Sequence, residues 1–187
     1  NQYRMSSHVW PTGLAAMMVS DRIDEYAEGE LRDGQVLPKN YQQQRSGGKQ
    51  SHDERANFNW AQQQVETRFD GQVAQLALKP GLVDPLSLHL LVISDLSRNQ
   101  LPAEYSFVDE REIKTYQIQK QGEETLKTPL GNLLTVRIKQ QKPDSTRITT
   151  LWFAPQLNYL PVQIVQEKKG KEILRMLIQD VRINQQP

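Results

Sequence analysis

The chain has 187 residues, 37% of them hydrophobic and 24% charged, so it can bury a core and is not a disordered chain. Its 23 lysines and arginines nearly balance its 22 aspartates and glutamates, which argues against nucleic acid or an anionic membrane surface as a partner. The absence of cysteine excludes disulfides, thiolate metal sites and cysteine nucleophiles, and it fits an oxidising compartment.

The chain opens with "NQYRMSSHVW", which already has a strand-like pattern. It contains neither a recognisable signal peptide nor a run of about 18 apolar residues, so we expect no transmembrane segment in it. We interpret the sequence as mature or trimmed, with the signal peptide and some N-terminal strand sequence removed or left out. We expect a single β-rich domain over residues 1–187.

Strand and hairpin signals dominate the first eighty residues. Segments 3–9 and 13–31 can be extended, although the Ala-Met part of the second could also open a helix. The Asp-Gly pairs in "RDGQ" and "FDGQ" predict two-residue hairpin turns. A turn at Asp70 and Gly71 places Thr67 opposite Ala74 on one buried face. The polar segment 46–54, "SGGKQSHDE", predicts an exposed hairpin tip or loop.

One stretch is typical of a helix: "LVDPLSLHLLVISDLSRNQ", residues 82–100. Asp84 can cap its start, Pro85 suits the first helical position and Asn99 can end it, so we expect a helix over about 85–98. The segment is apolar on most sides, which requires cover on more than one side, as when a curved sheet wraps a helix. Such a helix either fills the core or also lines a ligand cleft.

The second half again alternates strands and turns. The segments "KTPLGN", "KPDS" and "KKGK" predict turns, and "NLLTVRIK" predicts a strand that buries Leu134, Val136 and Ile138. We therefore predict a mainly β fold: a strongly curved antiparallel sheet or open β-barrel of about 8 to 11 strands, with one principal helix packed on its inner face. The predicted core includes Leu86, Leu90, Ile93, Val136, Ile138, Trp152 and Ile164.

No known catalytic motif occurs in the sequence. The three histidines, His8, His52 and His89, lack a partner at a metal-ligand spacing, and no nucleophile elbow, phosphate loop or dinucleotide fingerprint is present. We therefore predict no catalytic residue, metal or cofactor. Because His89 stands in an apolar helix, it is either a structural histidine bonded to a backbone carbonyl or the anchor of a hydrolase, which would need a carboxylate from a facing strand.

Aromatic residues are few, and most fall on alternating core positions. In "NFNWAQ", Phe58 and Trp60 share a face, which favours a core role, while a stacking platform for saccharides is the alternative on a glutamine-rich sheet. We name four candidate ligand-binding residues: His89, Trp60, Tyr159 and Trp152.

Five segments in order resemble the bacterial exported family catalogued as domain of unknown function 3108: "EGELRDGQVLPKNYQQQR", "FNWAQQQV", "VDPLSLHLL", "GEETLKTPLGNLLTVRIK" and "LWFAPQLNYLPVQIVQ". The resemblance covers roughly residues 3–182, and the last two segments are the most specific. The family usually has further strand sequence before the point where this chain begins. It carries no assigned activity, so the resemblance implies a fold and a periplasmic location in a Gram-negative bacterium but no site residues.

These observations together predict a non-catalytic binding or assembly protein of the cell envelope. Its ligand would be a lipid, a glycan or another envelope protein, and nucleic acid is not expected. The alternative is an envelope hydrolase that acts on glycan or peptide.

Overall fold

The computed structural model describes residues 1–11, 20–47 and 51–181. The first six strands are β1 (Gln2–Val9), β2 (Arg22–Arg32), β3 (Gln35–Ser46), β4 (His52–Asn59), β5 (Gln64–Phe69) and β6 (Gln72–Ala77). The helix α1 (Ser87–Ser97) follows. The remaining elements are β7 (Glu104–Asp109), β8 (Glu112–Thr128), β9 (Gly131–Gln141), β10 (Arg147–Ala154), the 3-10 turn η2 (Pro155–Leu157), β11 (Leu160–Lys168) and β12 (Lys171–Leu177).

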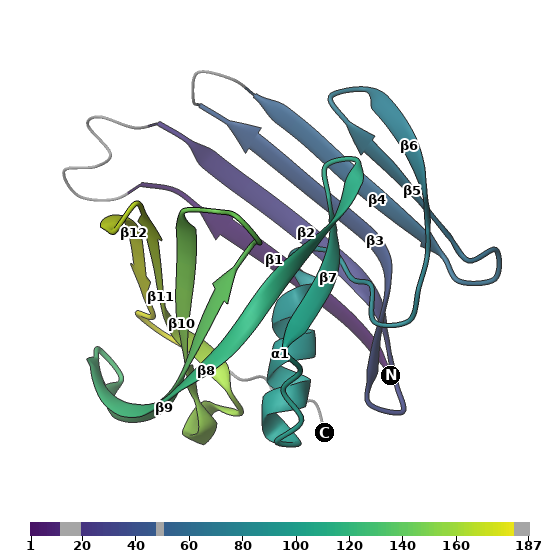
Figure 1. Cartoon of the computed structure of the whole chain (residues 1–187). Coiled ribbons are helices and arrows are strands. Elements are labelled where there is room, and N and C mark those ends of the chain that lie inside the picture. The colour runs from purple at the N-terminus through teal and green to yellow at the C-terminus, as the bar shows by residue number, and fades with distance from the viewer. Residues whose placement is uncertain (12–19, 48–50, 182–187) are drawn as a thin grey trace. The chain divides into compact units, whose positions relative to one another are not determined.

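The strands form two antiparallel meanders in which chain neighbours are also sheet neighbours. One sheet has the order β1 to β6 and the other has the order β7 to β12 (Figure 1). Neither sheet closes on itself. Because the described residues form antiparallel strands and one α-helix, the predicted mainly β fold with one principal helix is confirmed. The described residues hold twelve strands rather than 8 to 11, and the short strand β7 is one that the sequence pattern did not reveal.

Packing contacts divide the chain into two compact units. The first contains Asn1–Val92 together with Tyr105–Lys114, and the second contains Ile93–Glu104 together with Thr115–Pro187. The expectation of a single domain over residues 1–187 stays a prediction.

Two hairpins of the first sheet, β2 with β3 and β5 with β6, follow from Asp-Gly turns. Asp70 and Gly71 have φ values of 49° and 82°, the positive values that a two-residue turn of this kind needs. The predicted register is confirmed, because Thr67 pairs with Ala74. The loop predicted for 46–54 was too long, since β4 already begins at His52. The possible helix in the Ala-Met segment falls on residues 12–19, outside the described residues.

The start and end signals of α1 are confirmed. The carboxylate Oδ1 of Asp84 accepts hydrogen bonds from the backbone N–H groups of Leu86 (3.0 Å) and Ser87 (2.8 Å), and Asn99 ends the helix with a φ of 53°. The core residues predicted for this helix were partly wrong. Leu90 and Ile93 are only half-buried, because a helix that is apolar on most sides does not reveal from sequence which side packs. The buried leucines and valine of this helix are Leu88, Val92 and Leu96.

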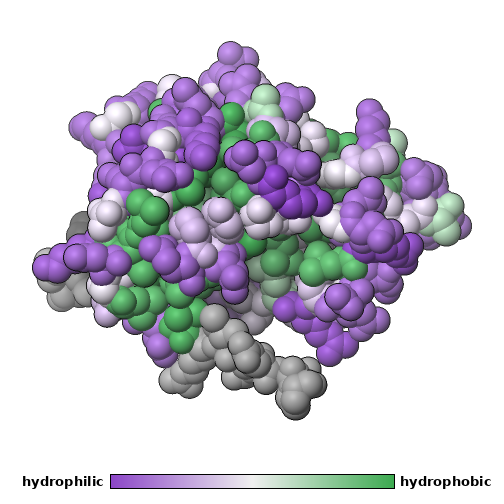
Figure 2. Space-filling model, turned by 90° about the horizontal axis from the view of Figure 1, so that it is seen from below, coloured by the Kyte–Doolittle hydropathy of each residue, from purple (hydrophilic) through white to green (hydrophobic). Residues whose placement is uncertain are grey.

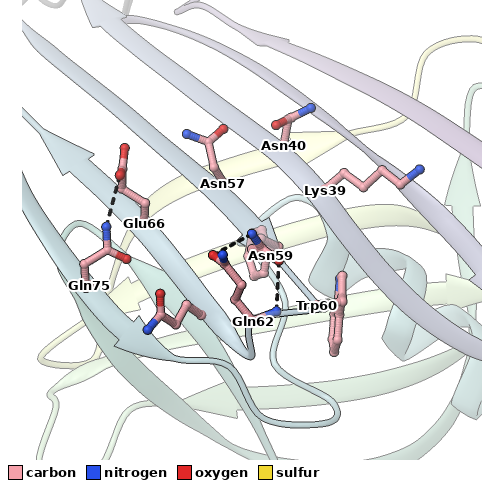
Figure 3. A pocket seen from close by; sticks show the side chains of 10 residues that line it. Lys39, Asn40, Asn57, Asn59, Trp60, Gln62, Glu66 and Gln75 are labelled. Carbon is pink, nitrogen blue, oxygen red and sulfur yellow. Dashed lines mark hydrogen bonds between the residues drawn. The ribbon is translucent and has the colours of Figure 1, made fainter.

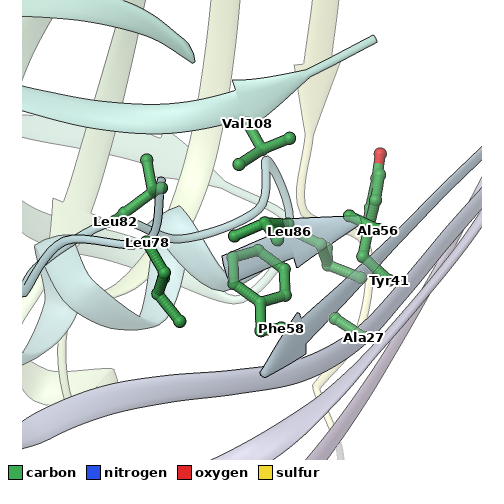
Figure 4. Close-up of a cluster of buried hydrophobic side chains, with 9 residues drawn as sticks. Ala27, Tyr41, Ala56, Phe58, Leu78, Leu82, Leu86 and Val108 are labelled. Carbon is green, nitrogen blue, oxygen red and sulfur yellow. The ribbon is translucent and has the colours of Figure 1, made fainter. Parts of the chain in front are cut away.

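The core of the first unit lies between its sheet and the segment that leads into α1. Phe58, Leu78, Leu82, Leu86 and Val108 belong to one cluster of buried side chains (Figure 4). The phenol of Tyr3 on β1 also contacts Ser87 Oγ at 2.7 Å, which ties the first turn of α1 to the sheet.

In the second unit, β9 buries different faces along its length. Leu133 and Thr135 are buried, and so are Val136 and Ile138, although alternate residues of a strand point to opposite faces. Leu134 is therefore exposed, against the prediction, while Val136 and Ile138 are core residues as predicted. Of the other predicted core residues, Leu86 is buried, whereas Trp152 and Ile164 are only half-buried.

Candidate functional site

A polar groove of about 640 Å³ lies on the first sheet, over strands β3 to β6 (Figure 3). Amide side chains dominate its lining, with one carboxylate, one lysine and two aromatic rings. The lining residues are Lys39, Asn40, Asn57, Phe58, Asn59, Trp60, Gln62, Gln64, Glu66 and Gln75.

The groove follows from the register of the hairpins. Asn40 pairs with Asn57, Asn57 with Glu66, and Glu66 with Gln75, so four side chains form a row across four neighbouring strands. These positions alternate with buried residues such as Phe58, which places the row on the face opposite the core. The alternation of β3 to β6 thus builds an apolar face and an amide-rich face on one sheet.

Several groove side chains are already held in place by hydrogen bonds. Gln75 Nε2 donates to Glu66 Oε2 at 3.0 Å, and Asn40 Nδ2 donates to Glu28 Oε1 at 2.8 Å. At the turn between β4 and β5, Asn59 and Gln62 bond each other twice, at 2.9 and 3.0 Å. These contacts orient the polar groups before any ligand arrives, which lowers the entropy cost of binding.

Other groups of the groove remain available. Asn57 and Gln64 make no side-chain hydrogen bond to a described residue, so each offers a carbonyl acceptor and an amide donor. The indole N–H of Trp60 donates to the carbonyl of Pro38 at 2.7 Å, which fixes the ring at the groove. The ring also packs against the core cluster of the first unit. The paired donors and acceptors of the amides suit a ligand with many hydroxyl groups.

A second polar cluster lies on the core side of the same sheet. Tyr41 Oη donates to Glu25 Oε1 at 3.0 Å, and Gln43 Nε2 donates to Tyr41 Oη at 3.0 Å. Burial lowers the pKa of His89, against the opposing effects of the Glu25 carboxylate and of the carbonyls of Leu86 and Pro85. Its Nδ1 is buried and has no hydrogen-bond partner among the described residues.

Glu54 is a buried carboxylate on β4. It is 3% exposed, and its Oε1 accepts a hydrogen bond from the Glu110 backbone N–H at 2.6 Å. Burial raises the pKa of Glu54 to about 7; the Glu110 N–H works against this shift, and the carboxylates of Asp109 and Glu110 add to it. Glu54 therefore changes charge near neutral pH.

Asp84 has a similar environment at the start of α1. Burial raises the pKa of Asp84 to about 6, although its bonds to Ser87 and Leu86 favour the charged form. Its second oxygen, Oδ2, is buried without a hydrogen-bond partner in the described part of the chain. The cap itself explains the position of Asp84, because its carboxylate accepts hydrogen bonds from two N–H groups at the start of the helix that would otherwise be unpaired.

The four candidate residues named from the sequence lie in different places. Trp60 lines the groove, and His89 belongs to the core side of the same unit. Trp152 and Tyr159 belong to the second unit. Trp152 is half-buried on β10, and its Nε1 lies 2.5 Å from Glu124 Oε1. Tyr159 follows η2 with a φ of 58°. Their roles in binding stay predictions.

Sequence reasoning missed the amides that line the groove. The signal was present in the alternation of β4, "HDERANFN", where the exposed positions carry Arg55, Asn57 and Asn59. The turn at Asp70 and Gly71 would also have placed Glu66 opposite Gln75. The full row further requires the register between β3 and β4, and the intervening loop has no turn motif that sets it.

The described residues contain no candidate metal cluster and no candidate membrane-spanning helix. Outside the gaps at 12–19, 48–50 and 182–187, no group of three or more histidine, cysteine, aspartate or glutamate residues is placed to hold a metal ion. Among the same residues no helix has the length and apolarity to cross a membrane. In the view of Figure 2, hydrophilic residues cover much of the surface and hydrophobic residues appear in patches between them.

The comparisons with known proteins identify the fold and the family. The crystal structure of a β-barrel-like protein of the domain of unknown function DUF1849 from Brucella abortus is similar, with a TM-score of 0.51 and 8% identity over 86% of this chain and 75% of that chain. At this identity the likeness shows the fold alone. No curated protein matches the sequence. A family model described as "Protein of unknown function (DUF3108)" matches residues 1–176, so the resemblance is confirmed and the chain belongs to this family.

Proposed function

We propose that this chain is a non-catalytic periplasmic protein that binds a glycan of the Gram-negative cell envelope in the groove of the first sheet. The observation that carries the proposal is the amide-rich row over β3 to β6. Trp60 lines the groove but also packs against the core cluster, so the amides are the main groups that a ligand would contact. Sugar hydroxyls both donate and accept hydrogen bonds, as side-chain amides do.

The lining favours a glycan over the other two ligand classes that the sequence suggested. A lipid chain needs an apolar pocket, because burying polar groups without partners costs free energy. A protein partner would be expected to bind a surface with large apolar or aromatic anchors, and the groove has mainly amides. Asn59 and Gln62, which line the groove, are hydrogen-bonded to each other and so keep their positions without a ligand.

The proposed compartment rests on sequence features. The chain lacks cysteine, and its segments resemble an exported family. Osmotic-shock fractionation of the native host tests this location, and recovery of the protein with cytoplasmic markers would contradict it.

We expect the substitution Asn57→Ala to weaken glycan binding about 5- to 30-fold, because it removes a donor and an acceptor at the centre of the row, a loss of about 1 to 2 kcal/mol. The purified protein is first screened on an array of envelope oligosaccharides. The affinity of wild type and variant for the strongest hit is then measured by isothermal titration calorimetry.

The matched control is Asn132→Ala, which removes an exposed asparagine from β9 in the second unit. It should bind the same oligosaccharide as tightly as wild type. Mass spectrometry of gently purified protein covers the lipid alternative. The proposal is wrong if no oligosaccharide binds, or if the Asn57 variant and wild type bind equally well.

The hydrolase alternative depends on His89 and a facing carboxylate. Glu25 is the carboxylate whose charge acts on the pKa of His89. Its Oε1 already accepts hydrogen bonds from Tyr41 and Gln43. We therefore expect His89→Gln to keep the fold, shown by far-UV circular dichroism, and to leave the phenotype of the native host unchanged. Intact folding with lost function would instead favour chemistry or ligand contact at His89.

A further inference from the structure

Two arginines face each other directly beside the groove. Arg55 on β4 pairs with Arg68 on β5, and both side chains are exposed. Directly opposed residues have Cβ atoms about 5 Å apart, and like charges at this spacing destabilise a sheet. An anion bound beside the two guanidinium groups would reduce any repulsion between them.

The two arginines differ in how their charge is balanced. Arg55 contacts the carboxylate of Asp53 at 3.2 and 3.5 Å. Arg68 makes no ion pair or side-chain hydrogen bond with any described residue, and its cross-strand neighbour on β6 is Val73. All the N–H donors of its guanidinium are therefore free, and no carboxylate of the described residues pairs with its charge.

Carboxylates near Arg68 on β5 already have partners. Glu66 accepts a hydrogen bond from Gln75, and Asp70 lies 2.7 Å from the ring nitrogen Nδ1 of His52. The hydrogen bond to His52 also lowers the pKa of Asp70. Neither group contacts the Arg68 guanidinium, which is exposed and open to an anion from solution.

The arginine pair continues the groove. Arg55 comes two residues before Asn57 on β4, and Arg68 comes two residues after Glu66 on β5. Residues two apart on a strand share a face and lie about 7 Å apart. The pair therefore stands one row beyond the row of Asn57, Glu66 and Gln75, a distance that one sugar unit or a substituent on it can span.

We propose that Arg68, with Arg55 beside it, forms an anion subsite at the end of the groove, and that the ligand is an acidic glycan carrying a carboxylate or phosphate group. This inference rests on the proposed glycan binding. The planar guanidinium fork matches the two oxygens of a carboxylate or phosphate, and two adjacent guanidiniums favour an anion over a neutral hydroxyl.

The test uses pairs of tetrasaccharides that have the same linkage but differ in charge. Mannuronate is compared with mannose, and galacturonate with galactose. A mannose tetrasaccharide phosphorylated at its terminal unit is the third acidic probe. We expect an acidic probe to bind at least tenfold more tightly than its neutral match at low salt. Added sodium chloride should reduce this preference. A uronate preference identifies a carboxylate ligand, and a preference for the phosphorylated probe identifies a phosphate ligand.

The substitution Arg68→Gln should reduce the acidic preference about tenfold, and Arg68→Lys should keep part of it, because lysine retains the charge but not the fork. Both variants should fold, since the residue is exposed, and Arg68→Gln also removes the repulsion from Arg55. The matched control is Arg147→Gln, an exposed arginine of β10 in the second unit.

Equal binding of neutral and acidic probes would overturn the anion subsite and leave the proposed glycan binding intact. An acidic preference that Arg68→Gln does not change would overturn the assignment to this pair. If no probe binds, acidic or neutral, and the envelope array is also negative, both the subsite and the proposed function are wrong.

Discussion

Replacing Leu86 with alanine is expected to lower the free energy of unfolding by about 2 to 5 kcal/mol. Leu86 is 6% exposed and packs in the cluster with Phe58, Leu82 and Val108, just before α1 begins. The truncation removes buried methyl groups and leaves a cavity that a close-packed core fills only in part. Urea unfolding, followed by tryptophan fluorescence and circular dichroism, measures the change.

The matched control is Leu31→Ala. Leu31 lies at the end of β2 and is 39% exposed, so its truncation should change the free energy of unfolding by about 0.5 kcal/mol or less. A loss of less than about 0.5 kcal/mol for the Leu86 variant would show that the segment before α1 does not pack on the sheet.

The substitution Glu54→Gln changes the free energy of unfolding by an amount that depends on pH. We expect this change to be more stabilising above pH 7 than below pH 4.5 by on the order of 3 kcal/mol. Burial raises the pKa of Glu54 from its ordinary value of 4.5 to about 7. Between these two values the folded protein binds a proton that the unfolded chain does not bind. The stability from this group is therefore complete below pH 4.5 and is lost as the pH rises through 7.

The measurement is the difference in free energy of unfolding between the two proteins from pH 4 to pH 8.5. Burial also raises the pKa of Asp84, with the same sign of effect, and it lowers the pKa of His89, which costs stability as the pH falls below 6.5. Both contributions occur in wild type and variant, so the difference isolates Glu54. The exposed Glu104 supplies the control Glu104→Gln, whose difference should not vary with pH in this way. A flat profile for Glu54→Gln would contradict the prediction.

The elements that depend on local chemistry could be predicted from the sequence. The turn at Asp70 and Gly71 fixed a two-residue hairpin, and alternation then assigned the buried face of both strands. The cap at Asp84 and the end at Asn99 located α1 within two residues. These signals act over a few residues, so they do not need knowledge of the tertiary structure.

Features that depend on distant packing could not be predicted. The buried side of α1 is set by what covers it, and its sequence is apolar on most sides, so Leu90 was assigned to the core although it is only half-buried. Leu134 was wrongly placed in the core because β9 changes its buried face along its length. The groove required the pairing of four strands, of which only the pairing of β5 with β6 follows from a turn motif.

The discontinuity of the first unit affects how the protein can fold during synthesis. Its sheet is complete at Ala77, yet the unit also contains Tyr105–Lys114. The N–H of Val108 donates to the carbonyl of Val83 at 2.8 Å, and the N–H of Glu110 supplies the partner of Glu54. A nascent chain that has reached only Gln100 therefore has six paired strands with an unfinished core. Such a chain leaves apolar surface uncovered until the segment Tyr105–Lys114 has been made, and exposed apolar surface of this kind favours aggregation.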